Sequence, residues 1–134
     1  MNAPQLCVGA IAVDADRLLM IRRGHGPAAG QWSVPGGRVA PGELLAEAVV
    51  RELWEETAVE GVCGELVGWA ERFDDDEHYV ILDFRVAVLE ATTPTAGDDA
   101  AEASWVPLSD VAELNLVDGL AEFLHEHGIL RTIT

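Results

Sequence analysis

Basic residues are scarce in this chain. It has 134 residues, of which 8 are basic and 24 are acidic, so its formal net charge is −16. Proteins that bind DNA or RNA rely on many Lys and Arg contacts to phosphate, so this balance argues against a nucleic-acid polymer as partner. A small anion can still bind if the few cations are gathered in one place.

Long apolar runs and paired cysteines are missing as well. No run approaches the roughly 18 apolar residues of a membrane span, and "MNAPQLCVGAIAV" lacks the basic lead of a targeting signal. We therefore expect a cytoplasmic protein without a membrane partner. Cys7 and Cys63 form no CxxC motif and have no His nearby at metal spacing. We expect two buried thiols rather than a disulfide or a reactive site.

Apolar residues make up 49% of the chain, which excludes a disordered acidic tail and allows a proper core. The length predicts one domain over residues 1–134. Apolar runs, the alternation of apolar and polar residues, and the Gly- and Pro-rich or polar segments between them predict the secondary structure. Strands are expected over 6–13, 18–23, 62–73, 78–90 and 104–108, and helices over 43–58 and 118–128. A short helix in "SDVAEL" (109–114) is expected to be capped by its Ser or Asp. This order of elements predicts a mixed α/β domain with helices packed on a sheet.

Three carboxylates crowd one side of the segment "RELWEET" (51–57). At 100° per residue, Glu52, Glu55 and Glu56 occupy an arc of about 100° on a helix. Like charges at this spacing repel one another, and acids in the last turns also oppose the helix dipole. Bound Mg²⁺ or Mn²⁺ would offset this cost, whereas a solvated acidic face is the commoner explanation of such a cluster. The core-facing stripe is predicted to comprise Ala46, Val49, Val50, Leu53 and Thr57.

One basic residue, Arg51, stands within the same segment. It is four residues from Glu47, so we expect it to pair either with Glu47 or with Glu43. Ahead of the helix, "VPGG" (34–37) carries two adjacent glycines, where bare backbone can approach a phosphate or offer a carbonyl to a metal.

The segment "GRVAPGELLAEAVVRELWEETAV" (37–59) resembles the Nudix box, whose pattern is G, five residues, E, seven residues, then R-E-U-x-E-E-x-G-U, with U a bulky aliphatic residue. The positions that match in register are Gly37, Glu43, Arg51, Glu52, Leu53, Glu55, Glu56 and Val59. One position departs, because Ala58 stands where the pattern has Gly. Gly there would end the helix in a left-handed conformation, so we expect Ala58 to shift the helix exit by a residue.

The resemblance implies the Nudix fold, an α/β/α sandwich with a mixed central sheet and the box helix packed on it. It also implies a hydrolase that uses Mg²⁺ or Mn²⁺ to cleave a diphosphate linkage in a nucleoside diphosphate bonded to a further group. Glu52, Glu55 and Glu56 would then be metal ligands, and Glu52 would also contact or deprotonate the attacking water. The carbonyl of Gly36 could complete the coordination.

The resemblance gives Glu43 and Arg51 a different role, as a pair that orients Glu52. Members of the family also draw a carboxylate from a later loop. The segment "GDDAAE" (97–102) offers three, and we favour Asp99, then Glu102, over Asp98. An acidic surface turn explains any one of them equally well.

Substrate contacts are expected from the cations that precede the box. The predicted phosphate-binding residues are Arg23, Arg22, Arg38 and the backbone at Gly37. Each Arg could equally be an ordinary surface residue. Trp32, Phe73 and Tyr79 are candidates for stacking a base, although most aromatic residues in such a domain simply pack. We assign no catalytic role to the four His residues.

The substrate is left open by the sequence. The family's markers for ADP-ribose and for dinucleoside polyphosphates, a Pro or a Tyr about sixteen to eighteen residues after the box, fall on "DDEH" (75–78) and are not met. Two substrates are therefore possible, a nucleoside triphosphate cleaved to monophosphate and pyrophosphate, or a nucleotide-sugar such as ADP-ribose. We expect the protein to be a monomer or a homodimer. A non-catalytic Nudix-like module that senses a nucleotide is the third alternative.

Overall fold

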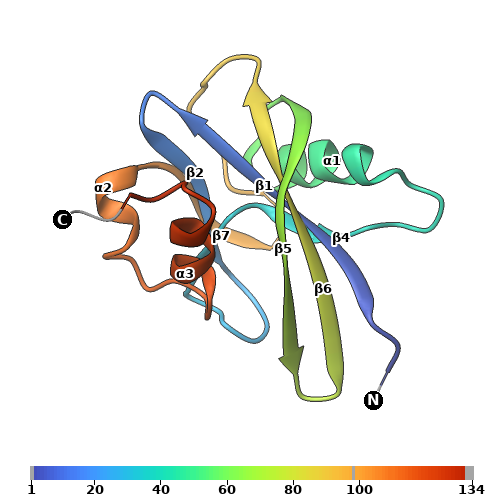
Figure 1. Cartoon of the computed structure of the whole chain (residues 1–134). Helices are drawn as coiled ribbons and strands as arrows, with labels where there is room; N and C mark the ends of the chain where they lie inside the picture. Colours follow the sequence, from blue (N-terminus) through green and yellow to red (C-terminus); the bar gives the residue numbers. More distant parts are fainter. Residues whose placement is uncertain (1, 98, 132–134) are drawn as a thin grey trace.

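A twisted mixed sheet forms the centre of the molecule (Figure 1). The computed structural model describes residues 2–97 and 99–131. The strands are β1 (Gln5–Asp14), β2 (Arg17–Arg23), β3 (Trp32–Ser33), β4 (Gly36–Arg38), β5 (Gly61–Asp74), β6 (Glu77–Val88) and β7 (Ala100–Pro107). The helices are α1 (Leu45–Thr57), α2 (Leu108–Val111) and α3 (Leu120–Glu126).

The order of the strands is β3-β2-β1-β6-β5, with β4 paired to β1 and β7 paired to β2. β1 runs parallel to β6, from Gln5 opposite Tyr79 to Ala12 opposite Val86, and the other pairs are antiparallel. The sheet is therefore mixed, as the sequence predicts.

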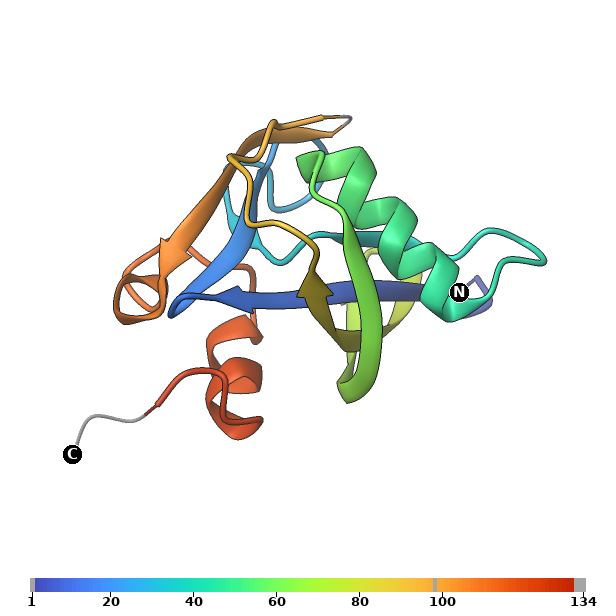
Figure 2. The ribbon, with the colours of Figure 1, turned by 90° about the horizontal axis from the view of Figure 1, so that it is seen from above.

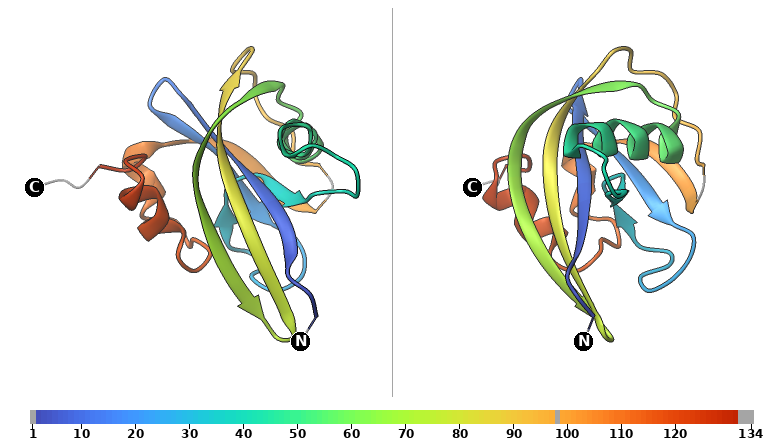
Figure 3. Two further views of the ribbon diagram at one scale, coloured as in Figure 1. Left: turned by 45° about the vertical axis from the view of Figure 1, so that its right-hand side comes forward. Right: turned by 90° about the vertical axis from the view of Figure 1, so that its right-hand side faces the viewer.

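The two faces of the sheet are covered by different helices (Figures 2 and 3). On one face, α1 packs through Val49 and Leu53 against alternate residues of β1 such as Val8 and Ala10. On the other face, Phe123 and Leu124 of α3 pack in one cluster with Ile11 of β1. Because side chains alternate along a strand, β1 contributes to both cores, and this explains its nearly unbroken apolar run.

Most predicted strands lie where the sequence places them, with ends that differ by one or two residues. The exception is the strand predicted over 104–108, which begins earlier, at Ala100, because residues 100–103 pair with Ile21, Arg22 and Arg23 of β2. The predicted cap of the short helix is wrong. α2 begins at Leu108, Pro107 occupies its N-cap, and no side chain caps it.

The first helix begins at Leu45 rather than at Glu43, because Leu44 is extended. The Glu47 carboxylate accepts a hydrogen bond from the Leu44 N–H at 2.9 Å, which satisfies one of the free donors of the first turn. At the other end Ala58 itself adopts the left-handed conformation, with φ 57°, and donates its N–H to the Trp54 carbonyl at 2.8 Å. The expected shift of the helix exit is therefore wrong.

The buried face of α1 also differs from the predicted stripe. Val49, Leu53 and Thr57 are buried as expected, but Ala46 and Val50 are not. The residues that take their place are Ala48 and Glu56. The helix is thus rotated about its axis so that one of the crowded carboxylates points inward. None of the helices in the described residues has the length and apolar character to span a bilayer.

Candidate active site

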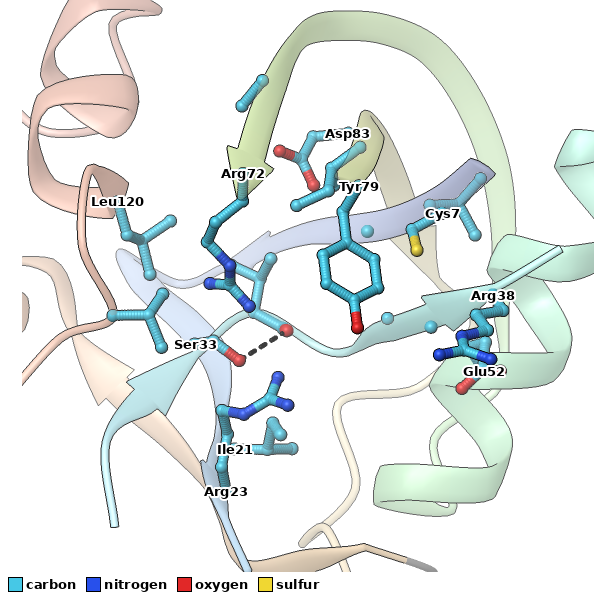
Figure 4. Close-up of a pocket in the computed structure, with 18 of the residues that line it drawn as sticks. Cys7, Ile21, Arg23, Ser33, Arg38, Glu52, Arg72, Tyr79, Asp83 and Leu120 are labelled. Atoms are coloured by element: carbon cyan, nitrogen blue, oxygen red, sulfur yellow. Dashed lines mark hydrogen bonds between the residues drawn. The ribbon is translucent and has the colours of Figure 1, made fainter. Parts of the chain in front are cut away.

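A cavity of about 920 Å³ lies beside the sheet (Figure 4). Its wall is formed by residues of β1 to β6, of α1 and α3, and of the loops between them. The three carboxylates of the box helix, Glu52, Glu55 and Glu56, all face this cavity, together with Gly36 and Gly37 of β4. Residues that are distant in the sequence therefore meet at one place.

Glu56 is the most deeply placed of these acids, with 7% of its surface exposed. The backbone N–H of Gly36 donates to its Oε1 at 2.7 Å. The pKa of Glu56 is raised to about 7, chiefly by burial and also by the negative charges of Glu52 and Asp99, and the Gly36 N–H and Arg23 act in the opposite direction. The charged form of Glu56 is therefore costly in the metal-free protein.

Arg51 links four groups around the acids. Its Nε and Nη2 donate to the two oxygens of Glu43 at 2.7 and 2.9 Å, and Nη2 also donates to the Arg38 carbonyl at 3.0 Å. Its Nη1 donates to Glu52 at 2.9 Å and to Glu55 at 3.0 Å. The guanidinium holds the pKa of Glu43 at about 2. Of the two expected partners of Arg51, the structure selects Glu43.

The glycines of β4 make room for the acids. A Cβ at position 37 would lie 2.5 Å from the carboxyl carbon of Glu52, so no side chain fits there while Glu52 keeps its place. This close approach is a physical reason for Gly at the first position of the box pattern.

The donor set fits a hard divalent cation by its chemistry and charge. Burial and two neighbouring acids raise the pKa of Glu56, and a bound cation would oppose this rise. Arg51 is hydrogen-bonded to Glu52 and Glu55. Within residues 2–97 and 99–131, no three acidic, imidazole or thiol groups lie close enough together to hold one ion. To hold one ion between them, the three carboxylates would have to approach one another more closely than they do here.

The structure separates the predicted cations into two groups. Arg23 and Arg38 line the cavity, and nothing in the described residues accepts a hydrogen bond from the buried Nε of Arg23. Arg22 does not line the cavity. It pairs with Glu102 across β2 and β7 at 3.5 Å, and both side chains are exposed.

The same separation applies to the later carboxylates. Asp99 lines the cavity and influences Glu56, whereas Glu102 points to the outer surface with Arg22. Asp98 lies outside the described residues. Of the aromatic candidates, Tyr79 alone lines the cavity. Phe73 is 58% exposed and stacks on His78, and Trp32 packs against the core.

A family model, the NUDIX domain, matches residues 3–127. The chain belongs to the Nudix family. It is 34% identical over 113 residues to the ADP-ribose pyrophosphatase of Methanocaldococcus jannaschii, a match that covers 83% of this chain and 66% of that protein. It is 29% identical over 105 residues to the human 8-oxo-dGDP phosphatase NUDT18, covering 76% of this chain and 32% of that protein. The chain thus spans less than two thirds of the length of either relative.

The solved structures give the same result. The MutT protein of Methanosarcina mazei superposes with a TM-score of 0.84 at 26% identity, and the match covers 94% of each chain. The predicted α/β class and the Nudix fold are therefore confirmed. In this Nudix chain the box helix packs on the sheet as expected.

Three acids and one Arg of the cavity wall were not expected from the sequence of this Nudix chain. They are Glu71 and Arg72 of β5, Asp83 of β6, and Asp118. Asp83 is the single acid in the apolar part of the strand predicted over 78–90, and it lies on the face opposite Phe84 and Val86. A lone acid in such a strand is a signal that sequence reasoning could have used, because buried carboxylates are rare.

Proposed function

We propose that this chain hydrolyses a diphosphate linkage in a nucleoside diphosphate bonded to a further group, with Mg²⁺ or Mn²⁺ as cofactor. The observation that carries the proposal is the buried carboxylate of Glu56, held by the Gly36 N–H, with Glu52, Glu55 and Asp99 around the same cavity. The negative charge of the buried Glu56 is costly, since burial, Glu52 and Asp99 raise its pKa, and a divalent cation would offset that cost.

The roles of the residues follow from their positions. Glu52, Glu55 and Glu56 would bind the metal, with Asp99 and the Gly36 carbonyl as further ligands. A bound divalent cation would neutralise charge that develops on the phosphate oxygens and lower the pKa of water. Members of the family generally use such ions.

The remaining groups position the substrate and the water. Glu52 would take a proton from the water that attacks phosphorus, while the bond to the leaving phosphate breaks. Glu43 orients Glu52 through Arg51, to which both are hydrogen-bonded. Arg23 and Arg38 would contact the diphosphate, since they are cations on the wall of the cavity and Arg23 has a donor to spare.

Two substrate classes are consistent with this site, a nucleoside triphosphate and a nucleotide-sugar such as ADP-ribose. The relatives named above are an ADP-ribose pyrophosphatase and an 8-oxo-dGDP phosphatase, so they support both. In both classes the linkage that breaks joins two phosphorus atoms, and the same carboxylates and cations would serve.

The test is a coupled phosphate assay with Mg²⁺ or Mn²⁺. Phosphate that appears from nucleoside triphosphates only after addition of inorganic pyrophosphatase shows release of pyrophosphate. Phosphate that appears from ADP-ribose only after addition of alkaline phosphatase shows cleavage to two monophosphates. Glu55→Gln should lower either signal by orders of magnitude, while the exposed control Glu113→Gln should leave it unchanged. No signal with any substrate and either ion would overturn the proposal and favour a nucleotide sensor.

A further inference from the structure

An apolar patch lies on the face of the sheet that α1 covers only in part. α1 packs in one cluster with Val8 and Ala10 of β1 and Val86 of β6. Strand alternation places earlier residues of the same two strands on the same face, where the hairpin of β5 and β6 extends beyond α1 (Figures 1 and 3). These residues and their neighbours on β5 form the sheet patch, which comprises Leu6, Leu66, Trp69, Phe73, Val80 and Leu82.

The sheet patch is continuous and separate from the cavity. Leu6 lies opposite Val80, and Trp69 lies opposite Leu82, so the patch runs across β1, β6 and β5. None of its six members lines the cavity wall. The patch is therefore a second surface of the molecule, on the other face of the same strands.

The large side chains of the sheet patch are strongly exposed. Trp69 is 61% exposed and Phe73 is 58% exposed, and Leu66 and Leu6 follow with 49% and 41%. An aromatic side chain has about 150–250 Å² of surface to bury, so the two rings alone leave roughly 250 Å² in water. A continuous apolar patch of this size on a folded chain marks an interaction surface.

The charged side chains at the border of the sheet patch bind each other. Glu71 borders both the patch and the cavity, and its Oε2 lies 2.7 Å from Nε2 of His78. His78 also stacks on Phe73, with the ring centroids 4.4 Å apart. A basic or an acidic partner would gain little from groups that already satisfy each other. A second neutral, apolar face is the surface that complements this patch.

A second copy of the chain supplies such a face. In a two-fold contact the same patch serves both partners, so one apolar surface is sufficient. Two twisted sheets pack face to face with their strand directions within about 30° of each other and an apolar layer between them. The turn at the end of the patch carries Asp74, Asp75, Asp76 and Glu77. Opposite strand directions in the two copies keep these acidic turns apart, so repulsion between the turns selects this arrangement.

The area of the sheet patch matches what a stable dimer needs. A standard interface removes about 800 Å² from each partner, of which roughly 450 Å² is apolar. The two exposed rings and the exposed parts of Leu6 and Leu66 supply roughly 400 Å². The patch would therefore form the apolar centre of such an interface, with the polar residues around it as the rim.

We propose that the sheet patch is the interface of a homodimer, in which two copies pack these sheet faces together with their strands in opposite directions. The inference does not depend on the proposed hydrolysis, because the cavity lies on the other face of the strands. The formal net charge of −16 opposes association of two copies, so the apolar contact has to outweigh this repulsion.

The test is analytical ultracentrifugation of the full chain over about 1–100 μM, a range that brackets the affinity of a moderately stable dimer. The variants are Trp69→Ser and Phe73→Ser, and the matched control is Trp54→Ser. Trp54 is 52% exposed on α1 and lies outside the patch, so its replacement makes the same change elsewhere on the surface. Far-ultraviolet circular dichroism checks that each variant keeps the fold.

The wild type and Trp54→Ser should sediment with twice the mass of the chain. Trp69→Ser and Phe73→Ser should weaken the dimer by about 100-fold or more, with unchanged circular dichroism. Added NaCl should tighten the wild-type dimer, because it screens the repulsion between two acidic copies.

Three results would overturn the inference. The first, which needs no variant, is a wild type that stays monomeric at the highest concentration, and it would leave the patch to a partner of another kind. The second is a dimer that salt dissociates, since ion pairs would then hold it. The third is a dimer that both patch variants leave intact or that Trp54→Ser weakens as much as they do, since another surface would then form the contact.

Discussion

Replacing Glu56 by Gln should stabilise the metal-free protein while abolishing its response to Mg²⁺. The pKa of Glu56 is raised from 4.5 to about 7, chiefly by burial. At 1.36 kcal/mol for each pH unit, the charged form costs about 3 kcal/mol in the folded state. Gln has nearly the same shape and keeps an oxygen that can accept from the Gly36 N–H, but it carries no charge.

The sign of the pH dependence follows from the direction of the pKa change. Between pH 4.5 and about 7 the folded protein keeps the Glu56 proton that the unfolded chain has lost, so stability falls as pH rises through this window. Above pH 7 the cost is complete and constant. Glu56→Gln should therefore match the wild type below pH 4.5 and exceed it by up to about 3 kcal/mol at pH 8.

Thermal unfolding in EDTA measures this difference. For a domain of this size, 3 kcal/mol corresponds to a rise in Tm of about 10 °C at pH 8, with little difference at pH 4. Mg²⁺ should raise the Tm of the wild type and of Glu113→Gln, and leave that of Glu56→Gln unchanged. A variant that is less stable than the wild type at pH 8, or a difference that does not vary with pH, would refute the reasoning.

Three further predictions concern α1 and the residues that contact it. Arg51→Lys loses the forked hydrogen bonds to Glu43 and the hydrogen bond to Glu52, so kcat/KM should fall about 10- to 100-fold. A variant with the same kcat/KM as the wild type would contradict the positioning role of Arg51. Gly37→Ala places a Cβ 2.5 Å from the Glu52 carboxyl carbon, so activity should fall about 100-fold while far-ultraviolet circular dichroism stays unchanged. Ala58→Gly relieves a left-handed conformation and should add about 1 kcal/mol in denaturant unfolding, and a loss of stability would show that Ala58 is unstrained.

The elements that the sequence predicts well carry local signals. The apolar run of β1, the alternation of β6 and the unbroken helical stretch before Ala58 each depend on neighbours within a few residues. The box helix belongs to this group, because Glu52, Glu55 and Glu56 lie within two turns and their common side follows from helical geometry. The partner of Arg51 does not follow from helical geometry, because Glu43 and Glu47 are both within its reach. The extended Leu44 decides between them, since its N–H binds Glu47.

The remaining features depend on pairing between distant segments. β7 extends back to Ala100 only because β2 offers it a partner, and the same pairing turns Glu102 to the surface with Arg22 while Asp99 lines the cavity. The inward direction of the Glu56 side chain depends on how α1 is rotated about its axis against the sheet. The spacing of residues along the helix does not predict this rotation.

The sequence by itself determined the family, the mixed α/β class and the acidic helix, because each of these depends on residue types at short, regular spacing. Only the tertiary structure decided which residues share the cavity. Asp83 and Arg72 line the cavity because β6 pairs with β1 and β5 pairs with β6. Residues of α3, from a later part of the sequence, form another part of the wall. The physical reason is that burial and the lack of a hydrogen-bond partner are set by the folded surroundings of a group. The Oδ1 of Asp83, for example, is buried only when Gly9 and its other neighbours are packed around it.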